Sequence, residues 1–127
     1  MEVTFTDRVP HAPGLGVGER RTVLGLSTDA GYTTYYVMLD ERRRVGMRAR
    51  VVSVPSGCCD ISDGCLPPSW SFDQQLEVIQ GRTVLRVGPH GWVAHWGVWM
   101  ERLAVGDGDA LAEAWKHAQC ERVTKER

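Results

Sequence analysis

The periodicity of the sequence changes once along the chain. Up to Val87, short segments rich in β-branched and aromatic residues alternate with turn-forming residues, and "MRARVVSV" shows the period-two pattern of a strand with one wet face. The strand-like segments cover residues 19–27, 32–40, 47–54, 75–79 and 83–87. From Trp99 the pattern becomes helical, over residues 99–105 and again after "GDGD", where Asp107 or Asp109 caps a second helix. We therefore expect an α+β fold: a small antiparallel, SH3-like or barrel-like sheet of about five strands with C-terminal helices packed on it.

The size and charge of the chain limit its organisation and its partners. At 127 residues, of which 43% are hydrophobic, the chain fits a single domain, residues 1–127. The 15 lysines and arginines against 16 aspartates and glutamates give a net charge of −1, so nucleic acid is not an expected partner. The N-terminus lacks a secretory signal, and no stretch approaches about twenty apolar residues. We expect no membrane partner and a cytoplasmic location.

The stretch "GPHGWVAHWGVWMERL", residues 88–103, holds three of the five tryptophans and two of the four histidines. Such histidines could hold a metal or act as a base, but large rings at a boundary between sheet and helix also bury much apolar area. We favour packing, with His95 partly buried against a backbone group and His90 in a turn; whether Trp92 to Trp96 is strand or helix stays open. The second expected helix places an apolar stripe on the sheet, formed by Leu111, Trp115 and Ala118.

The cysteines and histidines raise an enzymatic or metal-binding alternative. Three of the four cysteines cluster in "SGCCDISDGC", and their spacing does not match the paired C-x-x-C arrangement that presents thiolates to zinc. We interpret them as structural or incidental thiols, with a metal site or a redox role as alternatives. A histidine base would need a nucleophile or an acid, for which the candidates are Ser53, Ser56, Cys58, Asp60 and Asp63. No catalytic motif is present, and we expect no enzyme activity, no cofactor and no metal.

Arginines concentrate in "DERRRVGMRAR", residues 40–50, and Arg20 and Arg21 could join them from a neighbouring strand. A basic patch of this kind could bind phosphate or RNA, which makes a small nucleic-acid-binding barrel another alternative. The aromatic platform that single-strand binders combine with such charge is not evident, and acidic neighbours offset the patch. We interpret the cluster as a solvated sheet face, with Arg42 and Arg43 as candidate contacts for a protein partner.

The segment from Pro55 to Trp70 is rich in turn-forming residues, with prolines, glycines and aspartates throughout. We expect a long surface loop with at most a short helical turn. Loops this long in a small domain are often functional. Asp60 and Asp63 are the candidate contacts for a basic partner surface, and Trp70 is the candidate anchor.

Several segments of the chain resemble a known group of proteins. "VGERRTVLGLS", "YYVMLDERR", "LPPSW" and "WGVWMERLAVGDGDALAEAW" are similar to segments of small, mostly uncharacterised bacterial proteins, many of which resemble immunity proteins of polymorphic toxin systems. The resemblance implies a non-enzymatic inhibitor that binds a cognate protein toxin and covers its active site. A rigid sheet that carries one long loop would suit such an interface.

Overall fold

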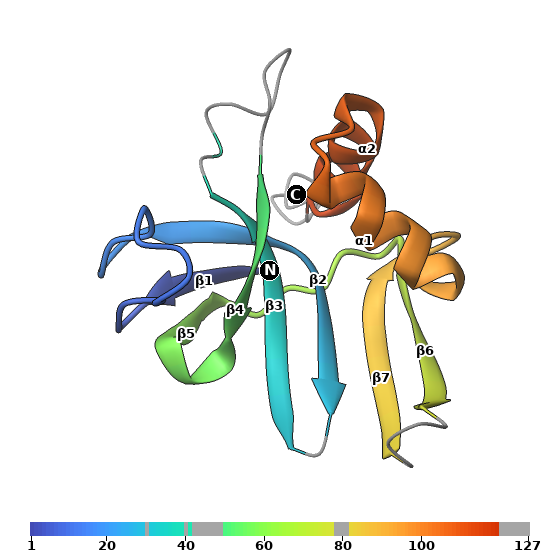
Figure 1. Cartoon of the computed structure of the whole chain (residues 1–127), viewed down its shortest axis with the longest axis horizontal. Helices are drawn as coiled ribbons and strands as arrows, with labels where there is room; N and C mark the ends of the chain where they lie inside the picture. The colour runs from blue at the N-terminus through green and yellow to red at the C-terminus, as the bar shows by residue number, and fades with distance from the viewer. Residues whose placement is uncertain (30, 40, 42–49, 78–81, 120–127) are drawn as a thin grey trace, which may run out of the picture.

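The computed structural model describes residues 1–29, 31–39, 41, 50–77 and 82–119. Within these residues, strands come first and helices last (Figure 1). The strands are β1 (Glu2–Phe5), β2 (Arg20–Asp29), β3 (Tyr32–Met38), β4 (Val51–Pro55), β5 (Cys59–Asp63), β6 (Trp70–Glu77) and β7 (Arg82–Pro89). The helices are α1 (Trp96–Ala104) and α2 (Gly108–His117), with short 3-10 turns η2 (Ser56–Cys58) and η3 (Val93–His95).

The sheet is antiparallel and is organised around β2 (Figure 1). Along one edge β2 pairs with β3. Along the other edge it pairs first with β1, over residues 20–22, and then with β7, over residues 26–29. β2 therefore belongs to two parts of the sheet: a short arm in the order β2-β1-β5, and a long arm in the order β4-β3-β2-β7-β6.

The α+β fold, with an antiparallel sheet and C-terminal helices packed on it, is confirmed. The sheet has seven strands rather than about five, and it is open: among the described strands, β4, β5 and β6 each pair with one neighbour. The two additional strands are β1, in a segment without an expected element, and β5. Because β5 lies inside the segment from Pro55 to Trp70, the expectation of one continuous loop there was wrong. Pairing with β1 orders the middle of that segment as a strand.

Two hydrophobic clusters lie on opposite faces of the long arm. The alternation along β3 separates them, since Tyr35 and Val37 enter one cluster while Tyr36 and Met38 contact the other. The arm cluster lies between the long and short arms and buries Met1, Val3, Phe5, Val9, Ala12, Leu15, Val23, Tyr35, Val37 and Val54. The helix cluster lies between the long arm and the helices and buries Leu24, Met38, Val93, Trp96, Trp99, Leu103, Ala110, Leu111, Ala114 and Ala118.

Trp96 and Trp99 pack directly onto the sheet where it carries glycine. Their ring centroids are 5.1 Å apart in an edge-to-face arrangement, which is favourable for aromatic pairs. A Cβ at Gly25 of β2 would lie 3.1 Å from Cη2 of Trp99, and a Cβ at Gly88 of β7 would lie 3.4 Å from Cζ3 of both rings. The two glycines therefore let the indoles approach the sheet backbone. The expected packing of these tryptophans between sheet and helix is confirmed.

The segment around Trp92 is helical rather than extended. Trp92 precedes η3, and Trp96 begins α1, so the first helix starts three residues before the expected Trp99. The expectation that His95 is partly buried was wrong, because Trp96, the next residue, takes the buried position and His95 is exposed.

Asp107 is the N-cap of α2. It is one of the two residues that the sequence predicted for this position. Its Oδ1 accepts hydrogen bonds from the backbone N–H of Asp109 and Ala110 at 3.0 and 3.1 Å. Its Oδ2 lies 2.8 Å from Nε of Arg102, in the last turn of α1. The hydrogen bond from Arg102, and then those from the backbone, lower the pKa of Asp107 below its usual value. One carboxylate thus joins the two helices.

The expected stripe packs α2 onto the sheet. Leu111 and Ala118 are buried, while Trp115 is partly buried against the helix cluster. Ala110 and Ala114 complete the buried face and bring the α2 backbone close to its neighbours. Among the described helices, none has the length and apolar character needed to cross a membrane.

Candidate functional site

Alternation along the short arm separates an apolar inner face from a polar outer face. On β1, Val3 and Phe5 are buried in the arm cluster, so Glu2 points outward. The register with β2 and β5 places polar residues of both neighbouring strands beside Glu2 and Thr4. The outer face carries three carboxylates and one guanidinium, on Glu2, Asp60, Asp63 and Arg20. The structure therefore brings the two expected aspartates together and adds Glu2, which sequence reasoning missed.

The described part of this outer face is acidic. Nη2 of Arg20 lies 2.9 Å from Oε1 of Glu2 in an exposed ion pair, an arrangement that contributes little stability. Asp63 accepts a hydrogen bond at Oδ1 from the backbone N–H of Cys65 at 2.9 Å, which fixes the chain just after β5. Asp60 is exposed. Three carboxylates against one guanidinium favour a positively charged partner.

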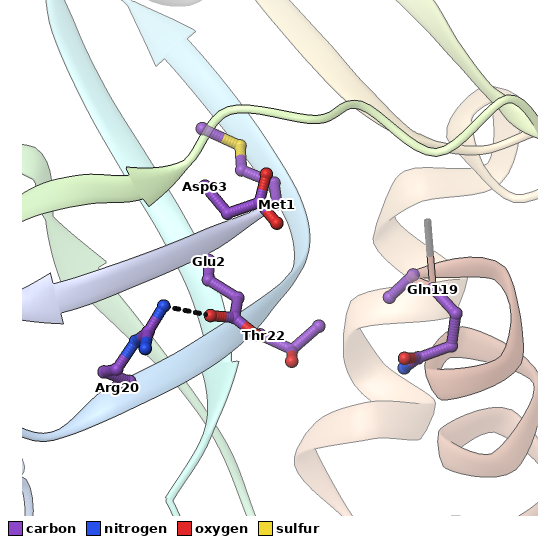
Figure 2. A pocket seen from close by; sticks show the side chains of 7 residues that line it. Met1, Glu2, Arg20, Thr22, Asp63 and Gln119 are labelled. Atoms are coloured by element: carbon purple, nitrogen blue, oxygen red, sulfur yellow. Dashed lines mark hydrogen bonds and ion pairs between the residues drawn. The ribbon is translucent and has the colours of Figure 1, made fainter. Parts of the chain in front are cut away.

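A pocket of about 330 Å³ opens between this outer face and the end of α2. Figure 2 shows Glu2, Asp63 and Arg20 on one wall and Gln119 on the other. Thr22, Met1 and Ala118 complete the lining. Small-molecule sites are usually lined mainly by apolar side chains, whereas most of these are polar. The pocket suits a polar side chain of a partner better than an apolar ligand.

Two exposed aliphatic side chains accompany the aspartates on the edge of the short arm. Ile61 pairs with Val3 across β5 and β1, so its side chain lies on the inner face, opposite to Asp60 and Asp63, and because β5 is an edge strand it remains 54% exposed. Leu66, which follows the strand, is 55% exposed. We call Asp60, Ile61, Asp63 and Leu66 the β5 surface. Apolar groups next to charged groups are typical of specific protein interfaces.

Trp70 packs against the core and is not a fully exposed side chain. It begins β6, is partly buried, and its ring packs against both hydrophobic clusters. Its indole N–H is buried, with no hydrogen-bond partner among the described residues. The ring therefore contributes to packing, and its expected role as a partner anchor stays a prediction. Arg42 and Arg43 lie outside the described residues.

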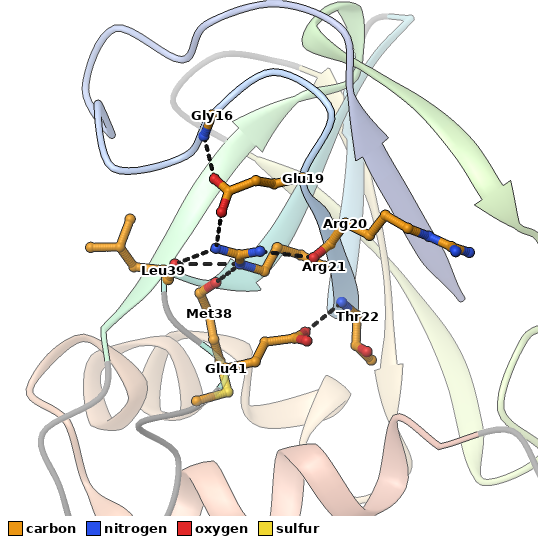
Figure 3. Close-up of polar contacts among 8 residues, drawn as sticks. All are labelled: Gly16, Glu19, Arg20, Arg21, Thr22, Met38, Leu39 and Glu41. Atoms are coloured by element: carbon orange, nitrogen blue, oxygen red, sulfur yellow. Dashed lines mark hydrogen bonds and ion pairs between the residues drawn. The ribbon is translucent and has the colours of Figure 1, made fainter.

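Arg21 uses its guanidinium to hold two strands together (Figure 3). Its Nε and Nη2 donate to the carbonyl oxygen of Leu39 at 3.3 and 2.9 Å, and Nε also donates to that of Met38 at 3.2 Å. Nη2 lies 3.4 Å from a carboxylate oxygen of Glu19. Only 13% of the side chain is exposed. Arg21 is therefore not available to a phosphate group, and Arg20 is already paired with a carboxylate.

The described cysteines, Cys58, Cys59 and Cys65, are partly buried thiols. Burial, and then the neighbouring Cys58 and Asp60, raises the pKa of Cys59 to about 11. A thiol with this pKa is protonated at neutral pH and is a poor nucleophile. No group of three or more histidines, cysteines or carboxylates among the described residues is arranged to hold a metal ion. Cys120 lies outside the described residues.

A serine and a histidine meet where β6 begins and α2 ends. Oγ of Ser69 lies 3.1 Å from Nδ1 of His117 and donates to the carbonyl oxygen of the same residue at 3.3 Å. Glu113 Oε1 is 3.9 Å from Nε2 of His117, which is beyond hydrogen-bond distance. Because the serine hydroxyl is bound to backbone and the carboxylate does not orient the ring, the contact joins strand to helix. Sequence reasoning did not find this pair, since its members are far apart in the chain.

Comparison of the chain with protein-family models, with curated proteins and with solved structures gives no match. The resemblance to immunity proteins therefore stays a prediction. On the β5 surface, the exposed Asp60 and the half-buried Asp63 lie along the same edge strand as the exposed Ile61, and the exposed Leu66 follows that strand.

Proposed function

We propose that this chain is a non-enzymatic protein-binding module, and that it acts as an immunity protein that binds and inhibits a cognate bacterial toxin. The observation that carries the proposal is the β5 surface. There the pairing of β5 with β1 leaves Asp60 exposed on the outer face and Ile61 exposed on the inner face of one edge strand, with Leu66 exposed just after it and the half-buried Asp63 beside the polar pocket. The resemblance noted in the sequence supplies the class of partner.

The chemistry of the β5 surface favours a basic partner. Carboxylates attract a cationic surface over distance and speed association, while the exposed aliphatic side chains gain affinity when they are desolvated. The pocket, lined by Glu2, Asp63, Arg20 and Gln119, offers a place for a polar side chain of the toxin. Arg42 and Arg43 stay candidate contacts at a second position. Of the arginines in the expected basic patch, Arg20 and Arg21 lend no support to a nucleic-acid partner, because Arg21 is bound to backbone and Arg20 to Glu2.

The proposal is tested by reversing one charge on the β5 surface. The partner captured from the native host should arrest growth when expressed alone, and co-expression of this chain should restore growth. Asp60→Lys should weaken binding to that partner about tenfold or more and abolish protection. Because Asp60 is exposed, the variant should melt at the same temperature as the unmodified chain.

Glu101→Lys is the matched control, since Glu101 is an exposed carboxylate on α1, away from β5. It should retain binding and protection. Equal binding by both variants would show that the contact lies elsewhere on the molecule. A captured partner that is harmless to cells would overturn the immunity role while leaving the binding surface in place.

A further inference from the structure

The long arm ends in the edge strand β6, and no other described strand pairs with its free edge. β6 pairs with β7 in an unbroken register from Trp70 opposite Pro89 to Glu77 opposite Arg82. The other two edge strands are protected. The ladder of β5 is interrupted by a register shift, and His11 Nε2 lies 2.5 Å from the carbonyl oxygen of Ser53 on β4. Natural proteins use such devices to prevent further pairing at a sheet edge. β6 has eight residues, whereas β4 and β5 have five each. Its register with β7 contains no bulge.

The free edge of β6 presents regularly spaced backbone groups. The backbone N–H of His90 donates to the carbonyl oxygen of Ser69. This bond identifies which residues of β6 form the hydrogen-bonded pairs with β7, because such pairs recur at every second residue. In an antiparallel pair, alternate residues direct their N–H and C=O toward the neighbour. The odd-numbered residues of β6 therefore bond to β7. Phe72, Gln74 and Leu76 direct their backbone groups away from it, and among the described strands none pairs with them.

An apolar row crosses the long arm and ends at this edge. Ser71 pairs with Gly88, which faces the tryptophans of α1, so Phe72 points to the opposite face of the sheet. There it pairs with Val87. The register continues the row through Leu26, Tyr35 and Val54. The row is buried at its β4 end, whereas Phe72 is 73% exposed. One more strand beside β6 would continue the row and cover the phenyl ring.

The charge of β6 indicates what kind of strand this would be. The sequence "WSFDQQLE" contains two acidic residues and no basic residue, and the register places Asp73 and Glu77 opposite Arg86 and Arg82 of β7. Basic side chains on an added strand would continue these rows with alternating charge, which is favourable, whereas a second copy of β6 would add acidic residues and no basic one. We propose that the free edge of β6 binds an extended segment of a partner protein, in which lysine or arginine alternates with apolar residues, by strand addition. This surface is separate from the β5 surface and does not depend on the immunity role.

A short blocked peptide of alternating lysine and valine is a suitable probe. It should bind saturably, and the same peptide with every amide N-methylated should not bind, because it cannot donate to the β6 backbone. Gln74→Pro removes an outward-facing N–H without removing a bond to β7, since proline is tolerated at the free side of an edge strand. This variant should bind the peptide about tenfold more weakly.

Phe72→Ala tests the apolar part of the site and needs no change in backbone. It should weaken peptide binding, while Tyr32→Ala, at a side chain that is 79% exposed on β3, should not. Asp60→Lys on the β5 surface should also leave peptide binding unchanged, which separates this proposal from the proposed function. Equal binding of the N-methylated peptide, or equal binding by Gln74→Pro and Phe72→Ala, would overturn the proposal. So would a dimer of the chain alone that Gln74→Pro converts to monomer, because the occupant would then be a second copy.

Discussion

Trp99 closes the space above Gly25, where a Cβ would lie 3.1 Å from Cη2 of the indole. That distance is tighter than nine in ten real Cβ contacts, and the aromatic ring is held by the rest of the helix cluster. Gly25→Ala should therefore push α1 away from the sheet. We expect a loss of about 1–3 kcal/mol in the free energy of unfolding, measured by urea denaturation.

Gly97→Ala is the control for this effect. Gly97 lies on the exposed face of α1, where a Cβ would meet nothing within 4 Å. Alanine there should stabilise the helix by about 0.5–1 kcal/mol. If Gly25→Ala and Gly97→Ala shifted stability in the same direction, the contact between Trp99 and the sheet would not be as tight as the structure has it.

Trp70 contacts both hydrophobic clusters, so it should behave as a packing residue. Trp70→Ala should lower the free energy of unfolding by about 2 kcal/mol, less than the approximately 3–5 kcal/mol expected for the fully buried Trp99. Phe72→Ala, two residues along the same strand, should leave thermal stability nearly unchanged because its ring is exposed. A stable Trp70→Ala variant that had lost partner binding would instead restore the role of Trp70 as an anchor.

The parts of the fold that depend on local patterns could be predicted from the sequence. The cap of α2 was predictable because an aspartate bonds to backbone groups two and three residues away. The strand β3 was predictable from its β-branched and aromatic residues. The packing of Trp99 followed from its size and its place between sheet and helix. Each of these signals lies within a few residues of the element that it marks.

The candidate site depended on contacts between distant segments and could be predicted only in part. Asp60 and Asp63 were found because aspartates in a long segment stand out. Their segment was expected to be a loop, since "CDISD" has weak strand propensity and the order comes from pairing with β1. The position of Glu2 beside them and the exposure of Ile61 are consequences of the same pairing. No property of the residues near Asp60 in the sequence carries that information.

The contact between Arg102 and Asp107 should make stability depend on pH in the acidic range. The pKa of Asp107 is lower in the folded chain than its usual value, so its contribution is present above about pH 4. The contribution is lost as the pH falls through the folded pKa. Asp107→Asn keeps an oxygen for the helix cap but loses the charge. The variant should melt at a lower temperature than the unmodified chain at pH 7, and the two melting temperatures should converge at low pH.

A double variant separates the ion pair from the cap. Arg102→Gln should also lower the melting temperature at pH 7, because Nε of Arg102 donates to Asp107 at 2.8 Å. If the two residues act through each other, the combined variant should be no less stable than the worse single variant. Fully additive losses would mean that each side chain acts independently, through contacts other than their shared one.

Cys59 should be the least reactive of the described cysteines. With its pKa raised to about 11 by burial, about one thiol in a thousand is ionised at pH 8, and the thiolate is the form that reacts. Iodoacetamide at pH 8, followed by mass spectrometry of peptides, should therefore modify Cys59 more slowly than Cys58 or Cys65. In denaturant the three rates should become similar, because burial is lost. Rapid modification of Cys59 in the folded chain would show an exposed, activated thiol and would return the redox alternative to consideration.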